Sequence, residues 1–277
     1  MANEIENKAL YVVATPIGNL SDFSERAKKV LSEVDFIAAE DTRVSGLLLS
    51  HFGIKKPIVN YFEHNKKEAG EKIVSELLLG KSCALVTDAG TPAISDPGTE
   101  LCRSCHESGI KVIPIPGASA VVSALSASGF DSRRFIFEGF LPQDSEKENV
   151  LLSLVNEKRT TIFYEAPHRL KKTLSEFYEA IGDRKICIAR ELTKINEEFV
   201  ITTLSDAIAM YEEKEPRGEY VLIFAGAEKT EEKFWQNLSV EEHVAFYIEK
   251  GMKKMDAIKL CAKDRGVPKN AIYKEML

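Results

Sequence analysis

Short apolar runs alternate with helical patterns along most of the chain, and this alternation constrains the fold more than any other feature. In the first part, the runs typical of strands are Ala9–Ala14, Phe36–Ala39, Ile58–Phe62, Cys83–Thr87 and Lys111–Ile115. Helical spacing lies between them, beginning after a plausible N-cap at Ser24 and stopping at Gly53 and Gly80, with a helix predicted over Leu47–Phe52. Strands and helices in this order predict parallel βαβ units.

The pattern restarts after Ser128-Gly129-Phe130. Strand-like runs follow at Arg134–Phe140, Thr160–Tyr164, Lys185–Ala189, Glu198–Thr203 and Tyr220–Ala225, and the last three are predicted to be neighbours in a mixed sheet. Helices are predicted over Ser145–Glu157 and over His168–Ile181, where Pro167 suits the first turn because its missing N–H costs nothing there. We therefore expect a domain boundary near residues 117–130.

The composition changes beyond Gly226. A charged linker, Glu228–Lys233, precedes segments with apolar helical stripes at Ala257, Ile258, Leu260 and Cys261 and at Ile272, Tyr273, Met276 and Leu277. Gly251 and Gly266 interrupt them, so a small helix-turn-helix appendage is predicted. The expected domains are residues 1–117, 118–228 and 229–277, the first two α/β and the third helical and basic.

The net charge of −6 conceals an uneven distribution. Between Lys250 and Lys274 the chain has eight basic residues and two acidic ones, so the rest of the chain is strongly acidic. A basic helical end beside an acidic body fits a nucleic-acid partner, although the total charge taken alone would argue against one.

Several classes of protein are excluded by what the chain lacks. Its five cysteines are an odd number and do not fit a disulfide framework, so a cytoplasmic location is expected. The N-terminus has no basic region before its first apolar run, and neither a signal peptide nor a membrane span is predicted. The motifs G-x-G-x-x-G, G-x-x-x-x-G-K-[ST], G-x-S-x-G and H-E-x-x-H are absent, and the histidines have no metal-ligand spacing, so no metal site is expected.

Four loops directly follow apolar strands and are rich in Gly, Pro or small polar residues: Thr15–Asn19, Asp88–Pro92, Pro116–Ser119 and Tyr164–Arg169. In open parallel α/β sheets, ligands bind outside the carboxyl ends of the strands, so these loops are predicted to line one crevice. Glycines in three of them would let the backbone approach a ligand closely. Each loop taken singly could equally be a tight turn.

The motifs of these loops resemble those of the ribosomal small-subunit RNA 2′-O-ribose (cytidine) methyltransferase I family, in the tetrapyrrole methylase-like superfamily. The segments that carry the resemblance are residues 14–20 (ATPIGNL), 40–43 (EDTR), 86–98 (VTDAGTPAISDPG), 164–169 (YEAPHR), 190–194 (RELTK) and 218–221 (GEYV). Asp88-Ala-Gly-Thr-Pro is the form typical of the rRNA enzymes, whereas tetrapyrrole enzymes usually have Gly-x-Gly-Asp-Pro. Ala118 departs from the family, where Pro often follows Pro-Gly.

The resemblance implies a two-domain tetrapyrrole methylase-like α/β fold with a small C-terminal helical extension. It further implies a homodimer that binds S-adenosylmethionine between its domains and methylates a cytidine ribose of small-subunit (16S) rRNA. Carried over to this chain, the cofactor contacts would come from Pro16, Gly18, Asp88, Ala89, Gly90, Thr91, Pro92, Ala118, Ser119, Tyr164, Arg190 and Val221.

Methyl transfer to a ribose hydroxyl requires an in-line nucleophile, exclusion of water and a group that takes or shares the hydroxyl proton. The candidates for that group are Glu165, His168, Asp41, Glu191 and Lys194. Asp41 could instead form a charge cluster with Glu40 and Arg43. The residues expected to contact RNA are Arg43, Arg169, Lys253, Lys254 and Lys263, although Arg169 and Arg190 could instead pair with Glu165 and Glu191.

Two other functions stay open at this point. One is a methyltransferase of the same fold that acts on a tetrapyrrole or a protein side chain, against which the Asp88 loop and the basic appendage argue. The other is a non-catalytic RNA-binding module, for which lysines of the appendage would bind phosphate. Those lysines could also be only the solvated face of amphipathic helices.

Overall fold

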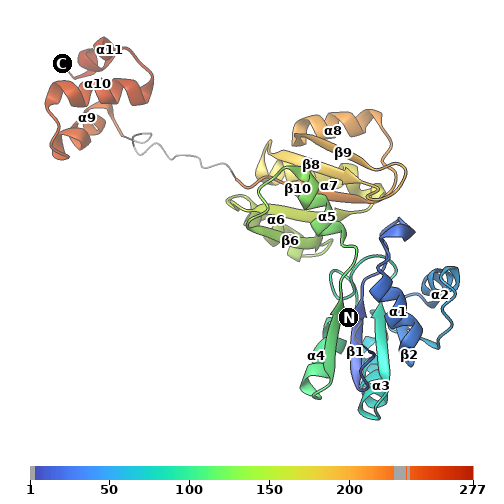
Figure 1. Cartoon of the computed structure of the whole chain (residues 1–277). Helices are drawn as coiled ribbons and strands as arrows, with labels where there is room; N and C mark the ends of the chain where they lie inside the picture. Colours follow the sequence, from blue (N-terminus) through green and yellow to red (C-terminus); the bar gives the residue numbers. More distant parts are fainter. Residues whose placement is uncertain (1–3, 228–234, 236–237, 277) are drawn as a thin grey trace. The chain divides into compact units, whose positions relative to one another are not determined.

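The computed structural model describes residues 4–227, 235 and 238–276. The chain divides into two compact units, residues 1–227 and 228–277, and each is considered by itself (Figure 1). The predicted linker at Glu228–Lys233 and the stripe residue Leu277 lie outside the described residues. None of the helices in the described ranges combines the length and apolar character that crossing a membrane requires.

The first sheet of the larger unit is parallel throughout, as the alternation of strands and helices predicts. Its strands lie in the order β3-β2-β4-β1-β5, so that the first strand in sequence lies between the fourth and the fifth. Their bounds are β1 Ala9–Val13, β2 Phe36–Ala39, β3 Ile58–Asn60, β4 Ser82–Val86 and β5 Lys111–Ile115. The accompanying helices are α1 Glu25–Glu33, α2 Thr42–His51, α3 Lys66–Leu78 and α4 Thr99–Glu107.

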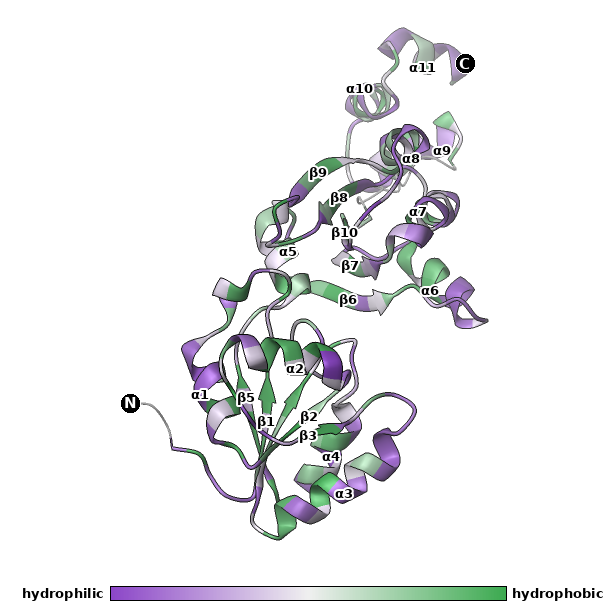
Figure 2. Ribbon diagram, turned by 90° about the vertical axis from the view of Figure 1, so that its right-hand side faces the viewer, coloured by the Kyte–Doolittle hydropathy of each residue, from purple (hydrophilic) through white to green (hydrophobic). Residues whose placement is uncertain are grey.

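Helices cover both faces of this sheet, which explains why its inner strands β1, β2 and β4 are buried along almost their whole length (Figure 2). Tyr11 and Val13 of β1 pack in one cluster with Leu31 of α1, and α2 contributes to the same cluster. Leu10, which points the other way, packs in a second cluster with α3 and α4. Because all five strands are parallel, their carboxyl ends lie along one edge of the sheet, which the helices on the two faces do not cover.

The second sheet is mixed, as predicted from its last three strands. Its order is β6-β7-β10-β8-β9, in which β6 and β7 are parallel and the other neighbours are antiparallel. Its strands are β6 Phe135–Phe140, β7 Thr160–Glu165, β8 Lys185–Arg190, β9 Glu198–Thr203 and β10 Tyr220–Phe224. The helices are α5 Ala120–Ser128, α6 Glu146–Leu154, α7 Pro167–Ile181 and α8 Leu204–Glu213; α5 packs on one face of the sheet and α7 and α8 on the other.

The helix α2 begins earlier than the predicted span Leu47–Phe52. Asp41 caps it, because its carboxylate accepts the N–H of Arg43 at 2.8 Å, and the helix starts at Thr42. Its buried face carries Ser45 as well as Leu49, whereas Leu47 is 75% exposed. The spacing of apolar residues therefore places the start of α2 too late, because the first buried position of the helix is occupied by the polar residue Ser45.

The smaller unit contains three helices in its described residues rather than a two-helix hairpin: α9 Val240–Glu249, α10 Lys254–Arg265 and α11 Lys269–Glu275. Ser239 and Glu242 form a capping box at the start of α9, and Gly266 ends α10 in the left-handed conformation. The core includes Val244, Ile258 and Ile272. Of the predicted stripe, Tyr273 is instead exposed.

A fully buried histidine lies in the core of this unit. The ring of His243 stacks on Trp235 with centroids 5.5 Å apart, and its Nδ1 accepts the Nε–H of Arg265 at 3.2 Å. The ring is therefore neutral with its hydrogen on Nε2, which lies 3.3 Å from Asp264 Oδ2. Burial, together with the charge of Arg265, lowers the pKa of His243 below its ordinary 6.5.

We expect this unit to lose stability as the pH falls below about 6.5. Since the pKa of His243 is lower in the folded state, the unfolded state takes up the proton first, and protonation favours unfolding. Trp235 is the single tryptophan of the chain, so thermal melts followed by tryptophan fluorescence from pH 7.5 to 5 report on this unit. His243→Gln should flatten the decline, while His106→Gln, at a histidine in the other unit, should not. A midpoint that is independent of pH in the unaltered protein would contradict this.

Candidate functional site

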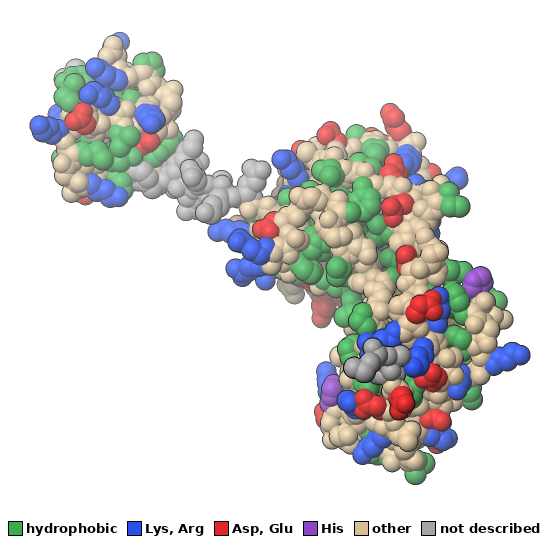
Figure 3. All heavy atoms as spheres, viewed as in Figure 1, with side chains coloured by type: hydrophobic (Ala, Val, Ile, Leu, Met, Phe, Trp, Pro, Cys, Tyr) green, Lys and Arg blue, Asp and Glu red, His purple; other side chains and the backbone are tan. Residues whose placement is uncertain are grey.

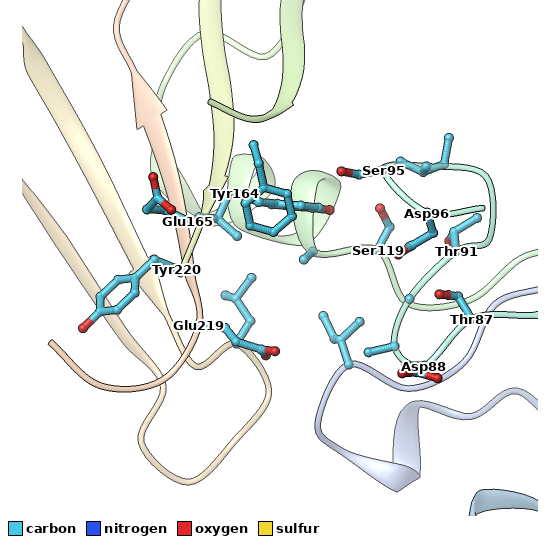
Figure 4. A pocket seen from close by; sticks show the side chains of 18 of the residues that line it. Thr87, Asp88, Thr91, Ser95, Asp96, Ser119, Tyr164, Glu165, Glu219 and Tyr220 are labelled. Carbon is cyan, nitrogen blue, oxygen red and sulfur yellow. The ribbon is translucent and has the colours of Figure 1, made fainter. Parts of the chain in front are cut away.

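A cavity of about 500 Å³ in the larger unit lies where the loops of the two sheets meet (Figure 4). All four loops expected to line one crevice contribute to it. Ile17 comes from the first loop, Asp88–Thr91 from the second, Ser119 from the third, and Tyr164–Pro167 from the fourth. The volume lies in the range that is usual for small-molecule sites.

Backbone hydrogen bonds join the first loop to the second. The N–H of Thr15 donates to Gly90 O at 2.8 Å, and the N–H of Gly90 donates back to Thr15 O at 3.2 Å. Gly90 has φ +96°, a backbone conformation that residues other than glycine rarely adopt. The conformation of the loop Asp88–Pro92 thus depends on having glycine at position 90, where the two hydrogen bonds to Thr15 form.

Side-chain hydroxyls join the remaining loops. Thr91 Oγ1 donates to Ala118 O at 3.0 Å, which ties the second loop to the third. Tyr164 Oη accepts the N–H of Val121 at 3.1 Å, which ties the fourth loop to the start of α5. The four loops are consequently bonded in series, and the cavity walls are held as one framework.

The residues assigned to cofactor binding divide into two groups. Those that line the cavity are Asp88, Ala89, Gly90, Thr91, Ser119, Tyr164 and Val221. Those outside its lining are Pro16, Gly18, Pro92, Ala118 and Arg190. Arg190 donates to Arg217 O at 2.7 Å and pairs with Glu198 at 3.3 Å rather than with Glu191.

Gly18 has a different role in the packing of the site. With φ +144°, it lies so close to the loop after β8 that a Cβ there would be 2.5 Å from Lys194 Cγ. This close approach lets the loop after β1, in the first sheet, contact the loop after β8, in the second. Gly18 therefore contributes to the site indirectly, because the absence of a side chain lets these two loops pack together.

Glu165, a predicted proton acceptor, lines the cavity but its carboxylate is fully buried and occupied. Oε1 accepts the N–H of Ala166 at 2.8 Å, and Oε2 accepts the hydroxyl of Thr173 at 2.6 Å. Arg169 pairs with Oε1 at 3.2 Å and donates to Leu141 O, so it faces inward. The Glu165 carboxylate therefore fixes the start of α7. Of the two roles considered for Arg169, contact with RNA phosphate or an ion pair with Glu165, the structure has the ion pair.

Glu191 and Lys194 form a charged group beside the cavity. Lys194 Nζ lies 2.8 Å from Glu191 Oε1 and 2.9 Å from an oxygen of Glu219, and Glu219 lines the cavity. Burial opposes the ionisation of Glu191, but the Lys194 ammonium and the N–H of Glu219 outweigh it and lower the pKa. Any effect of Lys194 on a bound ligand would pass through Glu219.

The remaining candidates for proton transfer lie outside the cavity lining. His168 is exposed in the first turn of α7. Asp41 caps α2 and pairs with Arg43 at 2.6 Å; that guanidinium and the N–H of Arg43 lower the pKa of Asp41 to about 2. A carboxyl with so low a pKa is a weak base.

Asp96, which the sequence interpretation overlooked as a site residue, lines the cavity with Glu40 and Asp88. Burial raises the pKa of Asp96 to about 6, and the charge of Glu40 contributes. Burial also raises the pKa of Asp88. The N–H of Asp41, which donates to Asp88 at 3.2 Å, lowers this pKa but does not outweigh the effect of burial. Asp96 lies within the same Gly- and Pro-rich loop as Asp88, so the loop's continuation was the available signal.

Further lining residues of the second sheet were also missed: Phe140, Leu192, Glu219 and Tyr220. The rule that ligands lie at carboxyl ends applies to parallel strands. Because β10 runs antiparallel to β7 and Tyr220 pairs with Glu165, the amino end of β10 lies beside the carboxyl end of β7. Residues before and at the start of β10 therefore reach the cavity.

The residues predicted to contact RNA lie on the surface, except Arg169. Arg43 is 88% exposed in its side chain. Lys253, Lys254 and Lys263 are all exposed, but Lys254 and Lys263 project from opposite sides of α10 because a helix turns about 100° per residue. On the face that Figure 3 shows, the Lys and Arg side chains of the smaller unit form several separate groups.

Sequence comparison places this site in a known family. A profile of tetrapyrrole (corrin/porphyrin) methylases matches residues 9–208. The ribosomal RNA small subunit methyltransferase I of Halalkalibacterium halodurans is 50% identical over 268 residues, covering 95% of this chain and 93% of the relative. The chain belongs to the ribosomal RNA small subunit methyltransferase I family, within the tetrapyrrole methylases.

Two further comparisons bear on the units of this family member. The relative of the same name from Thermotoga maritima is 47% identical over 219 residues, which are 79% of this chain but 99% of the relative. The part of this chain outside that match is about the size of the smaller unit. A solved structure of cobalt precorrin-4 methyltransferase, 19% identical, has the same fold with a TM-score of 0.58 over 79% of this chain and 95% of that one.

Replacing Tyr164 by Phe should lower the free energy of unfolding of the larger unit by about 1–2 kcal/mol, because the buried N–H of Val121 loses its acceptor. Chemical denaturation followed by circular dichroism measures the change. Tyr178→Phe, at an exposed tyrosine of α7, is the matched control and should stay within about 0.5 kcal/mol. Equal effects of the two substitutions would show that the hydroxyl does not join the loops.

Proposed function

We propose that this protein is an S-adenosylmethionine-dependent methyltransferase that methylates the 2′-hydroxyl of a cytidine in small-subunit rRNA. The observation that carries the proposal is the cavity that four bonded loops line together, with Asp88–Thr91 among its lining residues. The name of the relatives supports rRNA rather than a tetrapyrrole as the substrate. A protein that acts on rRNA would work in the cytoplasm.

The apolar lining and the charge of the cavity suit S-adenosylmethionine. Buried Ile17, Leu192 and Val221 offer apolar contacts for an adenine ring. The charged side chains among the described lining residues are all carboxylates: Glu40, Asp88, Asp96, Glu165 and Glu219. Arg169 and Lys194 neutralise the last two from outside the lining, so the other three leave a negative interior that favours a cationic ligand.

When bound, S-adenosylmethionine supplies a methyl group made electrophilic by a sulfonium. The loops of this chain orient it against the ribose and exclude water, which can contribute roughly 7 to 11 kcal/mol to lowering the barrier. Glu219 lines the cavity and its side chain is 78% exposed, so it is the carboxylate that a hydroxyl proton can reach, although its ion pair with Lys194 weakens it as a base. Glu165 is engaged in holding α7 and acts as a positioning residue.

Calorimetry tests the assignment of the cavity. S-adenosylmethionine should bind the protein more weakly as the pH falls below about 6, by up to about tenfold per pH unit, because protonated Asp96 no longer attracts a cation. Asp96→Asn should remove most of this dependence. Glu63→Gln, which deletes a nearby carboxylate outside the cavity lining, should retain it.

Binding too weak to measure at every pH would contradict the enzyme proposal and favour a non-catalytic RNA-binding module. Binding without any pH dependence would show that Asp96 does not face the ligand. The substrate is tested separately by mapping ribose methylation in small-subunit rRNA from cells that lack this protein. Loss of one 2′-O-methylcytidine is expected, and an unchanged pattern would exclude that substrate.

The smaller unit is proposed to bind RNA phosphate. Replacing Lys253, Lys254 and Lys263 together by Glu should weaken RNA binding and flatten its salt dependence by roughly 0.7 to 0.9 per lost contact. Filter binding at several salt concentrations measures the slope. A triple change of Lys55, Lys67 and Lys72, exposed lysines of the larger unit, is the control. Equal slopes in both triple variants would show that the smaller unit contributes no specific contacts.

The implied homodimer is also a proposal, which rests on the resemblance alone. Light scattering on the purified full chain gives its molar mass directly. A mass of 30.9 kDa would show a monomer, and twice that value would show the dimer.

A further inference from the structure

An irregularity in the edge strand β6 determines which way its aromatic side chains face. Phe137 pairs with Ile162, but the next pair is Gly139 with Phe163, so Glu138 is an extra residue in the strand. Such a bulge reverses the side-chain alternation beyond it. Phe140, opposite Tyr164, therefore lies on the face of Phe137, not on the opposite face that regular alternation would give it.

Contacts agree with this assignment. The ring of Phe137 meets Tyr164 edge-on with centroids 4.8 Å apart, and the ring of Phe140 meets it likewise at 5.7 Å. Gly139 has φ +69°, and a Cβ there would be 3.1 Å from Ser95 Oγ in the loop that follows β4. The bulge thus brings β6 against the cavity loop that contains Ser95 and Asp96 and turns one more aromatic ring toward the cavity.

Two large apolar side chains of the cavity lining are exposed, and Phe140 is the aromatic one of the two. Phe140 is 47% exposed and Ile94, in the loop after β4, is 43% exposed, whereas Ile17, Leu192 and Val221 are each at most 9% exposed. The buried side chains of Ile17, Leu192 and Val221 can surround a small ligand inside the cavity. An aromatic ring open to both cavity and solvent is available to a group that enters from a larger molecule.

We propose that Phe140 is a stacking platform for the cytosine base of the target nucleotide, which leaves the RNA stack so that its ribose can enter the cavity. This inference rests on the proposed function, because it assumes an RNA substrate. Proteins that modify nucleotides commonly extrude the base and hold it against an aromatic ring. Stacking fixes the base, and through the glycosidic bond it restricts the position of the ribose.

The chemical step places a demand on this positioning. The 2′-oxygen forms the new O–C bond with its lone pair, the S–C bond breaks with both electrons left on sulfur, and the hydroxyl proton passes to a carboxylate such as Glu219 or to water. An in-line arrangement of oxygen, methyl carbon and sulfur requires the ribose to be held on the RNA side. Phe140 offers a contact for that purpose on the wall formed by the second sheet.

The test compares Phe140→Leu, Phe140→Trp and Phe135→Leu in the full chain. Leucine keeps apolar volume and removes the ring, while tryptophan keeps a ring. Phe135 is the matched control, since it lies on the same strand and face as Phe140 and is 40% exposed, but is not part of the cavity lining. The measurements are KM and kcat with small ribosomal subunits and the S-adenosylmethionine affinity by calorimetry.

For Phe140→Leu we expect kcat/KM for the RNA to fall by about 5- to 150-fold, the range for losing one base–aromatic stack. The affinity for S-adenosylmethionine should stay within about twofold, Phe140→Trp should retain most of the activity, and Phe135→Leu should match the unaltered protein. A loss of S-adenosylmethionine affinity equal to the loss of kcat/KM would instead assign Phe140 to the cofactor site and overturn the inference. So would equal behaviour of Phe140→Leu and Phe135→Leu.

Failure of the proposed function would give a different result. In that case the unaltered protein itself would not methylate small subunits or would not bind S-adenosylmethionine. If the unaltered protein does both and Phe140→Leu has full kcat/KM, only the stacking role is wrong.

Discussion

The cavity of this protein depends on hydrogen bonds that join loops from different strands. Thr15 and Gly90 bond through their backbones, Thr91 reaches Ala118, and Tyr164 reaches the start of α5. Without these bonds, four Gly- and Pro-rich loops would each sample many conformations, and a ligand would have to order them at the cost of its own binding energy. The bonds order the site before a ligand arrives.

The two sheets make unequal contributions to this site. The parallel sheet supplies strand ends from one edge, and with them the carboxylates Glu40, Asp88 and Asp96. The mixed sheet supplies Tyr164 from the end of β7 together with Glu219 and Val221 from the start of β10, because antiparallel neighbours bring opposite ends together. A bulge in β6 adds Phe140. The carboxylates without a Lys or Arg partner among the described lining residues thus come from the parallel sheet, and the aromatic rings come from the mixed sheet.

Charge is also divided between the units. An acidic interior in the larger unit would repel RNA phosphates from the cavity while accepting a sulfonium. The lysines that we propose to bind RNA phosphate belong to the smaller unit and are exposed.

The alternation of strands and helices, the parallel first sheet and the loops that line the cavity could all be predicted from the residues alone, because apolar runs and Gly-rich turns are local properties. Asp88, Gly90, Ser119 and Tyr164 could likewise be placed in the cavity lining. The tertiary structure was needed to see that Thr173 and Arg169 bind the Glu165 carboxylate, and that Asp96 lies partly buried where the charge of Glu40 acts on it. It alone decided that Phe140 faces Tyr164. The accessibility of a carboxylate and the direction of a side chain beyond a bulge depend on partners distant in the chain, and no local pattern records them.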